Sequence, residues 1–319
     1  MNAPPSVTSS MRPRLVTGLF LPLAVALVLR LALFAFYQPW QPEVARTSVV
    51  QGDESLYHTA ALNIMNGRGY SFCTNAPFTP TNLRMPGHAF LISGIYRVCG
   101  VRPWAVLVAN IAFSLISLAA LWLLCRMVWD SRVAAWCAWL MALCPLDVVS
   151  TQTLLRESPF LVFLAVFWLC WLWYVVRASR AALAVSALAL ALSAYARDNT
   201  LYQPAFFAPL LLLPPAGGAG WRGRVAAVCL FTAVFIAALA PWSARNHRAL
   251  GTWSLTSAGG TTMLTGNAAL LLAAKHGVAY DQMLHVLHQV MLKRYVMPEP
   301  LPPEIQAALR GAYETNDAL

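Results

Sequence analysis

Long apolar runs recur along this chain of 319 residues, and they constrain its fold more than any other feature. The first run covers residues 15–37 and contains a single charged residue, Arg30. The other clear runs cover residues 104–129, 133–149, 159–176 and 225–242. A helix of roughly 20 apolar residues is long enough to cross the hydrocarbon core of a membrane. The runs therefore predict an all-α polytopic membrane protein.

The composition supports this class and excludes others. Hydrophobic residues make up 59% of the chain and charged residues 11%, a balance that soluble domains do not show. The formal net charge is +10, but the basic residues are scattered between apolar runs and form no basic stripe. We therefore expect contact with membrane lipid and no nucleic-acid partner.

Two further apolar segments, residues 181–195 and 201–213, are shorter than the roughly 17 residues that a span needs. The charged sequence ARDNT separates them, which suggests a bent or re-entrant pair lining a cavity. With these two segments, about seven spans are expected between residues 15 and 242. Arg30 is expected either to snorkel to the interface or to face the interior of the bundle.

The placement of the basic residues predicts the orientation. If the N-terminus is cytoplasmic, eight arginines fall on the inner side. They are Arg12, Arg14, Arg126, Arg132, Arg177, Arg180, Arg222 and Arg224. Residues 1–14 are expected to be disordered. Residues 243–319 are expected to form an outer-face polar tail, and a truncated C-terminal region is an open alternative.

Residues 38–102 form a long polar segment on the predicted outer face, with the sequence GDESLY at residues 52–57. Residues 54–66 have helical apolar spacing, and glycines follow them. Asp53 would then lie near the helix N-cap, where free backbone N–H groups favour an ionised carboxylate. Such a carboxylate can accept a proton from a hydroxyl group, although a simple capping role is the alternative. Tyr57, one turn further on, could line the same pocket.

A second part of the same segment reads TNLRMPGH and leads into residues 89–98, which we expect to form a helix at the membrane interface. Cys73 and Cys99 lie in this segment and could pair in an oxidising compartment. The outer loops also contain arginines that the positive-inside rule does not explain. These arginines are candidates for phosphate binding.

The order of the motifs resembles the bacterial GT-C glycosyltransferases of the protein O-mannosyltransferase and aminoarabinose transferase type. The motifs are GDExxY at 52–57, NGxGY at 66–70, RMPG at 84–87, APWSARN at 240–246, GG at 259–260 and GN at 266–267. The likeness extends from about residue 15 to residue 267. It implies a GT-C-like helical bundle whose long first outer loop carries interfacial helices.

The resemblance implies an inverting transfer of a sugar from a polyprenyl-phosphate donor. It assigns the catalytic base to Asp53, with Glu54 beside it, and a second acidic role to Glu157. A simple helix-start role for Glu157 is the alternative. Arg84 corresponds to the residue that contacts the donor phosphate, although the family sequence is often Lys/Arg-Pro-Pro and here reads Arg-Met-Pro-Gly.

Four further residues are candidates for donor binding, by position and chemistry. They are Tyr57, Arg197, Arg245 and Asn246. Arginine suits this role because its planar fork of N–H donors matches phosphate oxygens. The alternatives are an ion pair of Arg197 with Asp198, and an interfacial anchoring role for Arg245 beside Trp242.

The implied reaction requires no cofactor, and a divalent cation held by Asp53 and Glu157 is left open. The implied partners are a polyprenyl-phosphate-linked sugar, a glycan, lipid or protein acceptor, and membrane lipid. The implied location is the bacterial inner membrane, with the active site on the outer face.

Two other classes of function remain open. Several spans, Arg30 within an apolar run and a broken helix pair also suit a transporter or lipid flippase. Against that class, the strongest polar cluster is in the outer loops and no internal repeat is visible. The second alternative is a truncated, non-catalytic relative that keeps the fold.

Overall fold

The computed structural model describes residues 14–45, 49–215, 218, 220–285 and 287, and these residues form helices and loops without a strand. The chain divides into two compact units, Met1–Leu255 and Thr256–Leu319. The all-α class predicted from the sequence is confirmed. The disorder predicted for residues 1–14 concerns a segment that, up to residue 13, lies outside the described residues.

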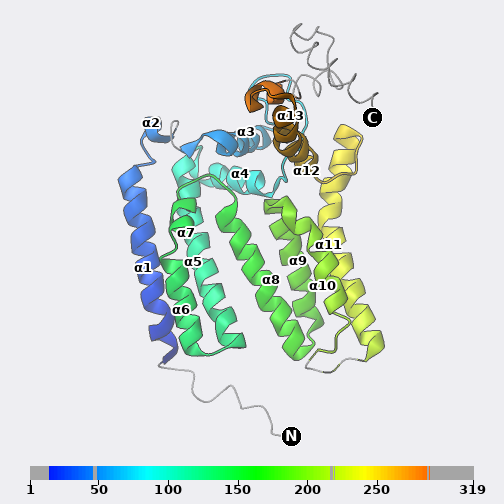
Figure 1. Cartoon of the computed structure of the whole chain (residues 1–319). Helices are drawn as coiled ribbons and strands as arrows, with labels where there is room; N and C mark the ends of the chain where they lie inside the picture. The colour runs from blue at the N-terminus through cyan, green and yellow to red at the C-terminus, as the bar shows by residue number, and fades with distance from the viewer. Residues whose placement is uncertain (1–13, 46–48, 216–217, 219, 286, 288–319) are drawn as a thin grey trace. The chain divides into compact units, whose positions relative to one another are not determined.

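Most helices of the first unit follow the apolar runs of the sequence (Figure 1). In chain order they are α1 (Arg14–Tyr37), α2 (Pro42–Val44), α3 (Gly52–Met65), α4 (Gly87–Cys99), α5 (Pro103–Val128), α6 (Ser131–Ala142), α7 (Pro145–Ser150), α8 (Glu157–Arg177), α9 (Arg180–Ala196), α10 (Pro204–Leu210) and α11 (Trp221–Leu250). Among the described residues, four helices are long and apolar enough to cross a membrane: α1, α5, α8 and α11.

The run at residues 133–149 does not form one helix. It is divided into α6 and α7, and Pro145 is the first residue of α7. Proline lacks the N–H that a helix interior needs but is well tolerated at a first helical position. The break expected between the two shorter apolar segments is present, because a 3₁₀ turn, Asp198–Tyr202, separates α9 from α10. Seven spans remain a prediction.

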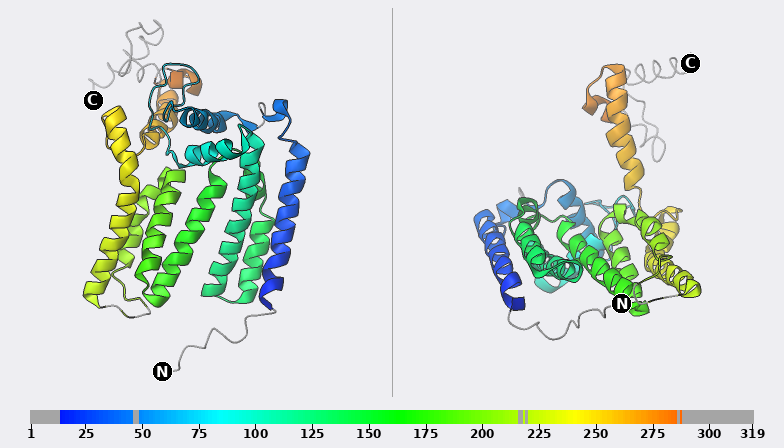
Figure 2. Two further views of the ribbon diagram at one scale, coloured as in Figure 1. Left: turned by 180° about the vertical axis from the view of Figure 1, so that it is seen from behind. Right: turned by 60° about the horizontal axis from the view of Figure 1, so that its bottom comes forward.

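Helices α3 and α4 lie across one end of the long helices rather than alongside them (Figures 1 and 2). Both were predicted from the sequence, and α4 has the amphipathic pattern of an interfacial helix. Its buried side chains, which include Ile92 and Tyr96, pack in one apolar cluster with Tyr57 and Ala61 of α3. The expected long loop with interfacial helices is therefore present.

The last long helix runs further than its apolar run. α11 continues through Pro241 and ends at Leu250, and the first unit ends at Leu255 rather than near Trp242. Trp242 is buried in the largest apolar cluster, together with Phe167 and Trp171 of α8 and Phe231 of α11. This packing fixes the C-terminal part of α11 within the first unit.

In the described part of the second unit, the helices α12 (Ala258–Thr262) and α13 (Ala269–His276) are joined by the π-helical turn Met263–Ala268. Its described core consists of Ala269, Ala273 and Met283. The rest of the predicted tail, residues 288–319, lies outside the described residues.

Candidate active site

The first turn of α3 presents two adjacent carboxylates. The helix begins after Gln51, so that Asp53 and Glu54 lie in its first turn and neither is the N-cap residue. The capping role considered for Asp53 is therefore wrong. Gly52 has a φ of 53°, a left-handed conformation that favours glycine at this turn. The Asp53 side chain is 47% exposed and accessible to a substrate.

Arg84 pairs with Asp53 beside the first turn of α3. Its Nη2 lies 3.0 Å from Oδ2 of Asp53 and 3.2 Å from Oδ1. The Tyr70 hydroxyl donates to the carbonyl oxygen of Arg84 at 3.1 Å, which fixes the extended segment that carries this arginine. The Nε of Arg84 is buried and has no hydrogen-bond partner among the described residues. The guanidinium group therefore keeps an unused N–H beside the exposed carboxylate.

A second ion pair joins Glu157 and Arg197. Glu157 is the first residue of α8, Arg197 directly follows α9, and their side chains approach to 3.6 Å. The guanidinium group of Arg197 also lies over the ring of Phe160, 5.4 Å from its centroid. Arg197 thus pairs with Glu157, and the alternative pairing with Asp198 is wrong. One carboxylate oxygen of Glu157, Oε2, is buried and has no hydrogen-bond partner in the described part of the chain.

Arg156 is a residue of this region that the sequence did not single out. Its Nη1 donates to the hydroxyl of Tyr57 at 2.9 Å, and Tyr57 is only 1% exposed. The ring of Tyr57 also makes an edge contact with His88 at 5.0 Å. The available signal was the position of Arg156 next to Glu157, in one of the segments whose arginines the positive-inside rule did not explain.

The charges of these side chains affect one another. Burial raises the pKa of Glu54, and the nearby carboxylates Asp53 and Glu157 raise it further. Burial also raises the pKa of Tyr57, and the positive charges of Arg156 and Arg84 partly offset that rise. Asp53 and Glu54 therefore belong to one electrostatic cluster with Glu157 and these arginines, although Glu157 is far from both of them in the sequence.

Arg245 and Asn246 make contacts of a different kind. Arg245 donates to the carbonyl oxygens of Thr81 at 2.8 Å and Tyr70 at 3.1 Å, and lies 4.7 Å above the ring of Trp242. Asn246 is fully buried and donates to the carbonyl oxygen of Ser254 at 2.8 Å. The structure does not place either side chain against Asp53 or Glu157. Both side chains donate hydrogen bonds to backbone carbonyl oxygens, and a donor-binding role for them remains a prediction.

An apolar cavity of about 480 Å³ is lined in part by residues that are close in sequence to the charged cluster. Its lining comes from α4, α5, α8 and α9 and includes His88, Phe113, Pro159, Phe163 and Ala196. Pro159 closely follows Glu157, and Ala196 directly precedes Arg197. An apolar cavity whose lining is next in sequence to charged residues suits a ligand that has a hydrocarbon chain and an anionic head.

No group of three or more His, Cys, Asp or Glu side chains that could hold a metal ion occurs in the part of the chain that the structure describes. Asp53 and Glu157 each face an arginine instead. The cation considered from the sequence stays a prediction, and we derive no step through it. Cys73 and Cys99 are both free thiols.

Residues 80–244 of the chain match the model of a protein family described as dolichyl-phosphate-mannose-protein mannosyltransferase. The match covers more than half of the chain and includes Arg84, Glu157 and Arg197. Asp53 precedes it, and Arg245 directly follows it. No curated protein and no solved structure gives a significant match.

Proposed function

Because the chain belongs to the dolichyl-phosphate-mannose-protein mannosyltransferase family, we propose that it is a glycosyltransferase with a lipid-linked donor. It transfers a sugar from a polyprenyl phosphate to an acceptor hydroxyl, with inversion at the anomeric carbon. The observation that carries this proposal is the ion pair of Asp53 and Arg84 on the exposed side of α3. A carboxylate base and a phosphate-binding cation are the two groups that this reaction needs at one place.

In the proposed reaction the acceptor oxygen attacks the anomeric carbon and the bond from that carbon to the phosphate oxygen breaks. Asp53 accepts the proton of the acceptor hydroxyl. The electron pair of the broken bond stays on the lipid phosphate, where Arg84 stabilises the developing negative charge. The unused Nε–H of Arg84 supports this role, since a buried guanidinium N–H without a partner is costly until an acceptor arrives.

The remaining charged residues assist the proposed reaction. Arg197 and Arg156 add positive charge near the phosphate, and Glu157 keeps Arg197 oriented through their ion pair. Glu54 places a second carboxylate next to Asp53. The apolar cavity that α4, α5, α8 and α9 line takes the first part of the isoprenoid chain.

The proposed location is the bacterial inner membrane, with the site on the outer face and the N-terminus in the cytoplasm. The α5–α6 turn, the α8–α9 turn and the start of α11 contain the inner-side arginines of the sequence. These segments lie at the end of the helices away from α3 and α4 (Figure 1). This segregation of positive charge supports the orientation.

Sugar transfer by membranes that contain the chain tests the proposal. The donors are a panel of labelled polyprenyl-phosphate sugars, and the product's anomeric configuration reports inversion. We expect Asp53→Asn to lower the rate by about 10²- to 10⁴-fold, because it removes the base. The matched control is Asp198→Asn, an acid-to-amide change outside the proposed machinery, which should retain activity at an equal protein level.

The outcomes separate the alternatives. Transfer that persists in Asp53→Asn would identify another residue as the base. The absence of transfer from every variant and donor would favour the non-catalytic relative. Movement of a labelled lipid across vesicles without a glycoside product would favour a transporter or flippase.

A further inference from the structure

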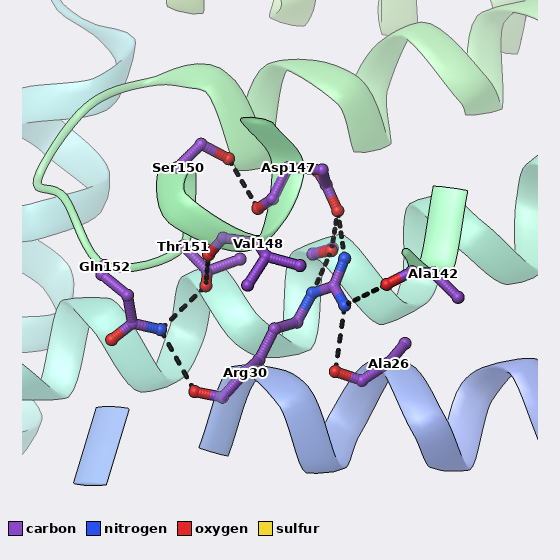
Figure 3. Close-up of polar contacts among 9 residues, drawn as sticks. Ala26, Arg30, Ala142, Asp147, Val148, Ser150, Thr151 and Gln152 are labelled. Carbon is purple, nitrogen blue, oxygen red and sulfur yellow. Dashed lines mark hydrogen bonds and ion pairs between the residues drawn. The ribbon is translucent and has the colours of Figure 1, made fainter. Parts of the chain in front are cut away.

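Arg30 is a fully buried charge in the middle of the apolar helix α1. It faces the bundle interior, which was one of the two positions considered from the sequence. Its Nη2 is paired with Asp147 of α7, and its Nη1 donates to the carbonyl oxygens of Ala26 at 2.9 Å and Ala142 at 3.3 Å (Figure 3). Its Nε donates to the Ser114 hydroxyl of α5 at 2.9 Å. This arginine therefore ties together α1, α5, α6 and α7.

Asp147 is fixed from two sides. Besides Arg30, the hydroxyl of Ser114 donates to the same carboxylate oxygen at 2.6 Å, and the side chain of Asp147 is 8% exposed. A buried ion pair gains little net stability, because both charges lose their hydration. Separating the two partners would leave a buried charge unpaired, which is costly. The pair therefore opposes a displacement of the short helix α7.

The segment that follows α7, residues 151–156, is held by further buried contacts at nearly every position. Gln152 donates to the carbonyl oxygen of Arg30 itself at 3.3 Å (Figure 3). Asn110 donates to the carbonyl oxygen of Thr153 at 2.8 Å. The ring Nε2 of His88 donates to the carbonyl oxygen of Leu154 at 2.7 Å, and Leu154 is fully buried.

This segment ends at the candidate active site. Arg156 donates to the hydroxyl of Tyr57, and the next residue, Glu157, pairs with Arg197. Between Asp147 and Arg156 there are only a few residues, and the contacts described above leave them little freedom. A shift of α7 would consequently move the Arg156 and Glu157 side chains within the charged cluster.

We propose that Arg30 and Asp147 are positioning residues, which fix α7 and residues 151–156 and so hold Arg156 and Glu157 at the active site. Neither residue touches the reacting atoms. The catalytic meaning of the pair rests on the proposed function, but the mechanical link between the pair and the segment does not. The two parts can be tested separately.

The first experiment measures backbone hydrogen exchange over residues 150–157 in the purified full chain. Removing one partner alone would leave an unpaired buried charge and could prevent folding. We therefore use Arg30→Met combined with Asp147→Leu, which replaces the pair by apolar side chains of similar size. Ser114→Ala is a milder variant, because it keeps both charges and removes only the hydroxyl between them.

We expect both variants to fold and to exchange about ten-fold faster or more over residues 150–157, with the rest of the bundle unchanged. The matched control is Ser186→Ala, which removes another buried hydroxyl that bonds only within α9, to the carbonyl oxygen of Leu183 at 2.8 Å. Unchanged exchange of residues 150–157 in Ser114→Ala and in the paired variant, if that accumulates, would overturn the proposal.

The second experiment measures kcat for sugar transfer in a double-mutant cycle. We expect Ser114→Ala to lower kcat by about ten-fold, because small displacements of catalytic groups are costly. Combined with Arg156→Gln, it should lower kcat hardly further than Arg156→Gln alone, since both act through one segment. A general loss of stability would instead multiply the two effects, and this outcome would overturn the positioning role.

The two readouts distinguish a failure of this inference from a failure of the proposed function. If the wild-type chain transfers no sugar, hydrogen exchange still decides whether the pair fixes the segment. If the wild-type chain is active and exchange is unaffected, the function stands and the positioning role falls.

Discussion

His88 is a fully buried titratable side chain between the apolar cavity and the charged cluster. Its Nε2 donates to the carbonyl oxygen of Leu154, and its Nδ1 has no partner among the described residues. Burial lowers the pKa of His88 from 6.5 to about 4. The imidazole is therefore neutral at physiological pH and acts as a fixed donor that holds the segment leading to Arg156.

This shift predicts a pH dependence of stability. Between pH 6.5 and about pH 4 the unfolded chain binds a proton at His88 that the folded protein does not, so stability falls as the pH falls through this window. Across this window, the free energy of unfolding falls by on the order of 3 kcal/mol. His88→Gln retains a donor for Leu154 but cannot titrate. Melting temperatures in detergent should therefore fall less for His88→Gln than for wild type between pH 7 and pH 4, and equal slopes would contradict the prediction.

At the scale of elements, the charged cluster depends on how closely α4 approaches α9. A Cβ atom at Gly87, the first residue of α4, would lie 2.7 Å from the backbone oxygen of Tyr195 and 2.9 Å from its carbonyl carbon. Such contacts are too short, and backbone cannot move aside as a flexible side chain can. The glycine therefore allows the start of α4, and with it Arg84 and His88, to lie against the end of α9.

Two glycine substitutions within the same helix test this packing. Gly87→Ala should destabilise the protein by about 1–3 kcal/mol, as overpacking of a closed contact does. Gly94→Ala serves as the control, because nothing lies within 4 Å of a Cβ atom there. It should stabilise the protein by about 0.5–1 kcal/mol through better helix propensity. Thermal unfolding of both variants would show opposite signs, and a neutral Gly87→Ala would refute the close approach.

At the scale of the whole molecule, charge is segregated along the first unit. The turns at the end of the helices away from α3 and α4 contain arginines, whereas the other end contains the paired carboxylates and arginines of the site (Figure 1). The exposed thiol of Cys99 lies at the end of α4, and Ser131 lies at the α5–α6 turn. The proposed orientation puts these two positions on opposite sides of the membrane.

A labelling experiment tests this orientation. In a variant that keeps Cys99 and lacks the other cysteines, a membrane-impermeant maleimide should label Cys99 while the spheroplasts are intact. A variant that lacks all native cysteines and contains Ser131→Cys should react only after the membrane is opened. The reverse pattern would place the N-terminus and the site on the faces opposite to those proposed.

The sequence by itself determined the features that depend on local pattern. Apolar runs of sufficient length and amphipathic spacing can be recognised within one window, so the all-α membrane class and the helices α3 and α4 were predicted correctly. The tight α5–α6 turn also follows from a local pattern, because the Asp130 carboxylate caps α6 by accepting hydrogen bonds from the backbone N–H groups of Arg132 and Val133. Asp53 and Arg84 were named from the order of motifs, without knowledge of their contact.

Only the tertiary structure decided which distant side chains meet. Arg84 and Asp53 are 31 residues apart, and Arg30 and Asp147 are 117 apart, so no local rule connects them. Arg156 was missed because its role follows from contact with Tyr57, and the pairing of Asp147 with Arg30 likewise follows from no local pattern. Side-chain pairing depends on packing across the bundle, where the cost of an unpaired buried charge selects a single arrangement.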